Sequence, residues 1–99
     1  MRLRAKVAAW LVLLREKGPG LRRPYADILE GAVRELRVGH GHLEVRILYF
    51  IHGKHIVLTN GFLKKTGIIP GAEIERAIRY HREWLNIQGS GGGHEKEGD

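Results

Sequence analysis

VRELRVGHGHLEVRILYFIHGKHIVLTNGFLKKT, residues 33–66, carries the pattern on which the predicted fold rests. Hydrophobic residues recur at every second position along much of it, as they do in β-strands, whose side chains point in turn to opposite faces of a sheet. The alternation falls into three runs: Ala32–Val38, Leu43–Ile51 and His55–Asn60. Glycine-containing turns at residues 39–42 and 52–54 separate these runs. The stretch therefore predicts an antiparallel meander of three strands or more.

Two arginines, Arg37 and Arg46, interrupt the otherwise hydrophobic strands. If the first two runs pair across the 39–42 turn, both arginines lie on the face opposite the aliphatic side chains. They could then form an anion site with Lys64 and Lys65, which follow the third run. Burying an arginine is costly unless a partner neutralises it, so ion pairing is the alternative, and the spacing slightly favours it. The candidate pairs are Arg37 with Glu35 or Glu44, and Arg46 with Glu44 or Glu73.

Helices are predicted on both sides of this stretch. Arg2–Lys17 carries one hydrophobic stripe, at Leu3, Val7, Trp10, Leu11 and Leu14. Pro70–Gln88 begins with a proline and has an acidic residue in its first turn, with an inner face at Ile74, Ala77, Ile78, His81 and Leu85. The connector Leu21–Gly31 is expected to hold a short helical turn around Tyr25–Glu30. The prediction is one α+β domain over residues 1–88, with a flexible glycine-rich tail at 89–99.

The charge and composition indicate the class of partner and the cellular compartment. The net charge is +6, and residues 1–88 hold 16 basic against 8 acidic side chains, a net charge of +8. A domain this basic favours a polyanionic partner such as nucleic acid. There is no cysteine, no hydrophobic run long enough to span a membrane and no signal peptide, which suits a cytoplasmic protein.

Other candidate residues lie in the turns and the last helix. Arg22 and Arg23 could touch a phosphate, although a solvated loop is the simpler interpretation. The histidine pairs at the two hairpin turns have zinc-like spacing, but the turns of a meander lie at opposite ends of the sheet, so no metal or other cofactor is expected. His81 falls on the inner face of the last helix, as a packed or capping histidine does.

Four motifs occur in an order that is similar to that of a known family: Glu35-Leu36-Arg37, Val45-Arg46-Ile47-Leu48-Tyr49, Gly61-Phe62-Leu63-Lys64-Lys65-Thr66 and Pro70-x-x-Glu73-Ile74. The connector pieces Gly18-Pro19-Gly20-Leu21 and Arg23-Pro24-Tyr25 match as well. Over residues 5–85 the chain resembles the phage-derived toxins of the RelE/ParE superfamily, most of all its HigB-like branch.

The resemblance implies a RelE-like fold and a ribosome-dependent mRNA endonuclease, the toxin of a toxin–antitoxin pair. Such enzymes use no metal and direct the RNA 2′-OH at the scissile phosphate. Carried over, Arg46 would stabilise the phosphate, Arg37 would assist or hold RNA, and Lys64 and Lys65 would bind the backbone or support proton transfer. The further RNA-binding candidates are Arg22, Arg23, Lys54, Arg79, Tyr80 and His81. The implied partners are a helix-turn-helix antitoxin, the ribosome and mRNA.

The chain departs from the family pattern at two points. It starts too late to contain the family's first strand and helix, so a bare sheet edge is expected to favour homodimerisation or pairing with a partner strand. Ile69 stands where the family has a threonine, which removes a good N-cap. Two alternatives therefore remain: a ParE-like inhibitor of DNA gyrase, and a non-catalytic relative that only binds an antitoxin or nucleic acid.

Overall fold

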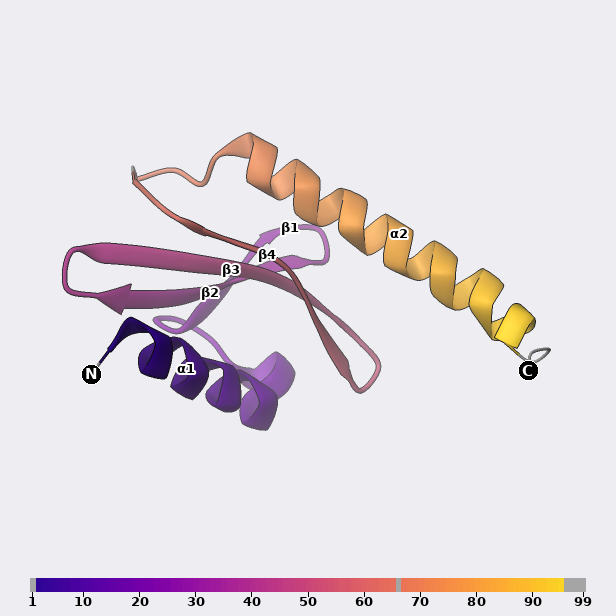
Figure 1. Ribbon diagram of the computed structural model, residues 1–99, viewed down its shortest axis with the longest axis horizontal. Coiled ribbons are helices and arrows are strands. Elements are labelled where there is room, and N and C mark those ends of the chain that lie inside the picture. Colours follow the sequence, from indigo (N-terminus) through magenta and orange to yellow (C-terminus); the bar gives the residue numbers. More distant parts are fainter. Residues whose placement is uncertain (1, 66, 96–99) are drawn as a thin grey trace.

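The computed structural model describes residues 2–65 and 67–95, with side chains described as far as residue 89. It is an α+β fold in which one helix lies on each side of a four-stranded sheet (Figure 1). The elements in chain order are α1 (Leu3–Lys17), the 3-10 turn η1 (Gly18–Gly20), β1 (Ala26–Glu30), β2 (Val33–His40), β3 (Leu43–His52), β4 (His55–Leu63) and α2 (Gly71–Glu95).

The sheet is an antiparallel meander with strand order β1-β2-β3-β4. The three predicted strands are confirmed as β2, β3 and β4, with β3 central between its two neighbours. The helical turn expected around Tyr25–Glu30 is wrong, because this segment forms β1 against β2. Ala26 pairs with Leu36, and the Arg37 amide donates to the Tyr25 carbonyl over 2.8 Å. The hydrogen bonds to β2 therefore stabilise an extended conformation more than the weak helical preference of this short segment stabilises a helix.

Helix α1 packs on one face of the sheet through the predicted stripe. Leu14 is fully buried, and Val7, Trp10 and Leu11 contact the same cluster, which includes Leu36, Val38 and Tyr49 of the sheet. The helix ends at Gly18, whose positive φ of 52° suits glycine and whose amide donates to the Leu14 carbonyl.

Helix α2 covers part of the opposite face. Ala77 is buried against Val33 and Leu48, and His81 stacks on Phe50 with ring centroids 4.2 Å apart. Leu85, expected on the inner face, is instead 39% exposed, and Trp84 packs on Phe50 in its place. The cause is the rotation of the helix about its own axis, which turns residue 84 and not residue 85 toward the sheet.

The ends of α2 also differ from expectation. The helix begins at Gly71, and the Pro70 carbonyl accepts from the Glu73 amide over 3.0 Å, so the proline precedes the first turn. At the other end the helix passes Gln88 and continues to Glu95, beyond the edge of the sheet (Figure 1). The remainder of the expected tail, residues 96–99, lies outside the described residues.

Within the described chain, neither helix is long and apolar enough to cross a membrane. The outer strands of the sheet are β1 and β4. Ile28 on β1 is 60% exposed, and Leu58 on β4 is 47% exposed. Homodimerisation through one of these edges stays a prediction.

Candidate functional site

Arg37 of β2 and Arg46 of β3 are directly opposite each other in the sheet, as the strand pattern predicts. They lie on the same face as Val33 and Leu48, which contact α2. The sheet register alone therefore brings the two guanidinium groups together, since side chains of paired residues share a face.

Arg46 is almost fully buried and is held between two carboxylates. Its Nη1 lies 2.9 Å from Glu44 Oε1, and its Nε lies 3.1 Å from Glu35 Oε1. The exposed fractions of the Arg46 and Glu35 side chains are 6% and 4%. Of the partners considered from the sequence, Glu44 is confirmed, whereas Glu73 accepts a hydrogen bond from Asn60 and pairs with Arg76 instead.

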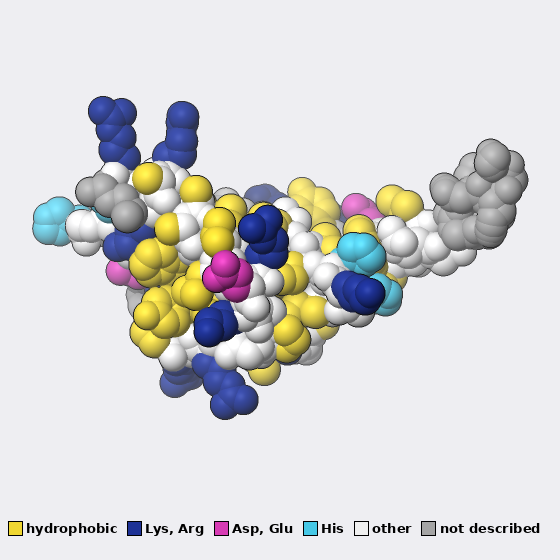
Figure 2. Space-filling view, turned by 90° about the horizontal axis from the view of Figure 1, so that it is seen from below, with side chains coloured by type: hydrophobic (Ala, Val, Ile, Leu, Met, Phe, Trp, Pro, Cys, Tyr) yellow, Lys and Arg dark blue, Asp and Glu magenta, His cyan; other side chains and the backbone are white. Residues whose placement is uncertain are grey.

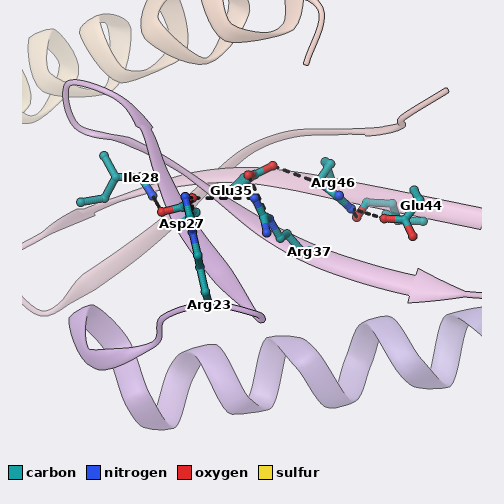
Figure 3. Close-up of polar contacts among 8 residues, drawn as sticks. Arg23, Asp27, Ile28, Glu35, Arg37, Glu44 and Arg46 are labelled. Atoms are coloured by element: carbon teal, nitrogen blue, oxygen red, sulfur yellow. Dashed lines mark hydrogen bonds and ion pairs between the residues drawn. The ribbon is translucent and has the colours of Figure 1, made fainter. Parts of the chain in front are cut away.

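Arg37 continues this pattern toward the edge of the sheet. Its Nε lies 3.1 Å from Glu35 Oε2, which confirms one of the two pairs expected for it, and its Nη2 lies 3.7 Å from Asp27 Oδ2. Asp27 in turn accepts from Arg23, with Nη2 at 2.7 Å. Six alternating charges thus cross three strands (Figure 3). We call them the charge row: Arg23, Asp27, Arg37, Glu35, Arg46 and Glu44.

The charge row is electrically balanced, with three arginines against three carboxylates. An anion that approaches Arg46 must therefore compete with carboxylates already in place. Glu35 is buried and fixed, but the Glu44 side chain is 51% exposed. Glu44 is consequently the member that an incoming phosphate can displace at least cost, because a half-exposed ion pair contributes little stability.

The lysine pair lies beside the outer end of the charge row. The Lys64 amide donates to the Glu44 carbonyl over 2.7 Å, which extends the pairing of β3 and β4 past Leu63. Lys65 is exposed and Lys64 is half-buried. Neither has a carboxylate partner among the described side chains. These are the cations next to Arg46 that are available to a ligand.

The other candidates lie elsewhere. Arg23 belongs to the charge row, whereas its neighbour Arg22 is exposed on the connector. Lys54 is in the β3–β4 turn, at the opposite end of the hairpin from Lys64 (Figure 1). Arg79 and Tyr80 are exposed on α2, with the guanidinium 5.5 Å from the tyrosine ring centroid.

His81 is half-buried against Phe50, four residues along β3 from Arg46, a separation of about 13 Å in a strand. His52 and His55, facing each other at the β3–β4 turn, both contact Trp84. His40 and His42 are at the other end of the sheet. Among the residues described, no three histidine or carboxylate side chains are grouped to hold a metal ion.

Asp27 is the member of the charge row that sequence reasoning missed. Its distance of four residues from Arg23 is a usable signal, but the local sequence predicts a helical turn there, and the structure shows a strand in which Asp27 pairs with Glu35. Arg23 donates to the Asp27 carboxylate and holds its pKa below the usual range. The Ile28 amide adds to this shift by a second hydrogen bond.

Arg23→Gln should therefore raise the pKa of Asp27 toward its ordinary value, because the largest cause of the depression is removed. The measurement is an NMR titration of the Asp27 side-chain carboxyl carbon in both proteins. Arg22→Gln is the matched control, since Arg22 is adjacent in sequence and, unlike Arg23, forms no ion pair with Asp27. An unchanged Asp27 pKa in Arg23→Gln would contradict this assignment.

Comparison with known proteins completes the description of the site. Residues 1–81 match the family described as "Phage derived protein Gp49-like (DUF891)". The matched range contains α1, the whole sheet, the charge row and the lysine pair. No curated protein matches the chain significantly.

Proposed function

The chain belongs to the Gp49-like family of phage-derived proteins, and from this premise we propose that it is the toxin of a toxin–antitoxin pair that cleaves mRNA on the ribosome. The family fits the toxin–antitoxin context in general. The resemblance to the HigB-like branch of the RelE/ParE superfamily supports the narrower activity. The helix-turn-helix antitoxin, the ribosome and mRNA are the partners that follow from it.

One observation carries the proposal: two arginines face each other across β2 and β3, and two lysines without a carboxylate partner among the described side chains lie at the adjacent end of the sheet. The 2′ oxygen loses its proton and attacks the neighbouring phosphate, and the pentavalent species formed carries additional negative charge. Fixed cations stabilise that charge, and no metal is required for it. The P–O5′ bond then breaks, which leaves a 2′,3′-cyclic phosphate on one fragment and a 5′-OH, formed by protonation of the leaving oxygen, on the other. In this proposal Arg46 faces the phosphate, Arg37 supports it, and Lys64 and Lys65 bind the backbone or assist proton transfer.

The carboxylates of the charge row shape how such a site would work. Glu35 contacts both arginines, at 3.1 Å each, and so fixes their positions. Glu44 occupies the outer side of Arg46 until RNA arrives. The phosphate then replaces the Glu44 carboxylate on Nη1, while Glu35 keeps the guanidinium in place. The arginine is thereby held in one geometry, and little is lost in reorganisation when the charge develops.

The test is expression from a tightly controlled promoter, with growth and mRNA ends followed over time. We expect growth arrest and cuts within translated regions, mapped by primer extension and bearing 2′,3′-cyclic phosphate ends. Blocking translation should abolish the cuts, and co-expression of the protein encoded by the adjacent reading frame should relieve the arrest. A DNA-damage response with intact mRNA would favour gyrase inhibition and would sink the nuclease proposal.

A second candidate function is binding without catalysis, to an antitoxin or to nucleic acid. The burial of Arg46, with only 6% of its side chain exposed between two carboxylates, favours it. Stable expression with neither arrest nor mRNA cleavage would support this candidate over the nuclease.

A further inference from the structure

A second cationic site lies at the β1 edge of the sheet, next to the Arg23–Asp27 end of the charge row. It is a pocket of about 650 Å³ where the connector between α1 and β1 meets the strands. Ile28 of β1, Arg34 of β2 and Tyr49 of β3 line it, and they are consecutive partners across the sheet. Tyr49 belongs to the core cluster under α1, so the pocket opens on the α1 side. Figure 2 shows that side, where Lys and Arg side chains are spread among hydrophobic ones.

The lining of the pocket is positively charged. Arg22, Arg23 and Arg34 line it together with one carboxylate, that of Asp27. Asp27 is already paired with Arg23 at 2.7 Å. Arg22 and Arg34 have no carboxylate partner among the described side chains. Two uncompensated guanidinium groups facing one pocket create a site for an anion, and guanidinium matches the geometry of phosphate oxygens.

A buried polar group at the floor of the pocket points to the same conclusion. Tyr49 is 1% exposed, and its hydroxyl makes no well-aligned hydrogen bond within the described chain. Burial raises the pKa of Tyr49, although the charge of Arg34 and its donation toward the hydroxyl oxygen act in the opposite direction. The hydroxyl therefore stays protonated and can donate. Arg34 can only donate, so the hydroxyl hydrogen still lacks an acceptor. Buried donors are nearly always satisfied in native proteins, so one without a partner indicates a missing acceptor.

The size of the pocket and its apolar lining indicate that the ligand has an apolar or aromatic part in addition to its anionic group. A pocket of this volume is in the range of sites for drug-sized ligands and is much larger than an inorganic phosphate needs. Pro19, Leu21 and Ile28 supply the apolar part of the lining, which we call the apolar wall. A flat base can lie on such a wall, and arginine side chains also stack on bases.

We propose that this pocket binds a nucleotide, with its phosphate on Arg22 and Arg34 and its base against the apolar wall formed by Leu21 and Ile28. The site shares Arg23 and Asp27 with the end of the charge row, but neither Arg37 nor Arg46 lines it, and it takes no part in the proposed cleavage. Two sources share this chemistry: a free mononucleotide, and one nucleotide of an RNA strand held away from the scissile phosphate. The Tyr49 hydroxyl donates to a ligand oxygen once Arg34 turns toward the phosphate.

The experiment is NMR titration of the full chain with adenosine 5′-monophosphate, uridine 5′-monophosphate, inorganic phosphate and a short RNA oligonucleotide. We expect the amides of the connector and β1, residues 20–28, to shift with the mononucleotides, while those of the β3–β4 turn do not. Inorganic phosphate should bind at least about tenfold more weakly, because it lacks the contact with the apolar wall. Absence of connector shifts with every nucleotide, or equal affinity for inorganic phosphate, would overturn the proposal.

Variants locate the ligand. Arg34→Gln and Arg22→Gln should each weaken nucleotide binding by about tenfold, the loss expected for one charge-assisted hydrogen bond. Tyr49→Phe should weaken binding without loss of the fold, because only a hydroxyl lacking an aligned partner is removed. The matched control is Arg82→Gln on α2, which removes one exposed charge and should leave binding unchanged. Wild-type affinity in Arg34→Gln would place the ligand elsewhere and refute the assignment.

The two sources are separated by competition. If the oligonucleotide displaces the mononucleotide from the connector, the natural ligand is one nucleotide of an RNA strand. If both bind at once, it is a free nucleotide. Either result supports a nucleotide pocket. The same titrations are repeated with the Lys64→Ala/Lys65→Ala variant, which alters the proposed cleavage site. The connector amides should still shift in this variant, so that failure of the nucleotide pocket and failure of the cleavage site can be told apart.

Discussion

Glu35→Ala should lower the free energy of unfolding by about 3–5 kcal/mol, the largest loss expected from any single substitution in the charge row. The carboxylate is 4% exposed and contacts both Arg37 and Arg46 at 3.1 Å. Its removal leaves Arg46 buried with one carboxylate, the half-exposed Glu44, and with the Val45 carbonyl, which carries no charge. A guanidinium held out of water without sufficient compensation is the physical cause of the loss. Urea denaturation followed by far-UV circular dichroism measures it.

Glu44→Ala is the matched control, because it removes a carboxylate from the same guanidinium at the exposed side. We expect a loss of only about 0–1 kcal/mol, as for solvent-exposed ion pairs. A second comparison is the double variant Glu35→Ala/Arg46→Met, which removes both buried charges and should recover much of the stability. Equal losses of unfolding free energy for Glu35→Ala and Glu44→Ala would mean that burial does not determine how much each carboxylate of the charge row contributes to stability.

For activity, the largest effect is expected from Lys64→Ala/Lys65→Ala. If the lysine pair serves the proposed RNA site, the rate of mRNA cleavage should fall by about 10²-fold, the usual cost of losing a group that stabilises developing charge. The fold should persist, because Lys65 is exposed and Lys64 is anchored through its backbone amide and not through its ammonium group. Cleavage of a translated reporter mRNA measures the rate, and the melting temperature checks the fold.

The control for this variant is Arg4→Ala/Lys17→Ala, which removes the same amount of charge from exposed positions on α1. It should leave cleavage within about twofold of the parent, since only the long-range part of the electrostatic attraction changes. This design avoids Arg46→Ala, in which loss of activity and loss of stability cannot be separated. Full cleavage and growth arrest by the lysine double variant would remove Lys64 and Lys65 from the site.

Several features of the fold were predictable from local sequence pattern. Alternation over residues 33–60 placed β2, β3 and β4, and the short 39–42 turn made Arg37 and Arg46 neighbours on one face. The hydrophobic stripe of α1 was predictable for the same reason, because a 3.6-residue period has only one packed side. Lys64 and Lys65 follow the third run directly, which grouped them with the arginines, and the structure places Lys64 beside Glu44.

Other features depended on contacts between distant segments. β1 has five residues and becomes a strand through its pairing with β2. Trp84 replaces Leu85 at the sheet because the position of α2 over Phe50 sets the helical phase. The nucleotide pocket is likewise assembled from the connector, β1, β2 and β3, and no local pattern marks it.

The local sequence is enough to predict that the two arginines share one face of the sheet, since strand parity and turn length are local properties. That Glu35 lies between Arg37 and Arg46, and that Asp27 and Arg23 extend the row to the sheet edge, depends on the pairing of three strands and is seen only in the folded protein. The choice of partner depends on distances near 3 Å, which register, twist and side-chain packing set together. A sequence with several carboxylates within reach cannot specify those distances before the strands have paired.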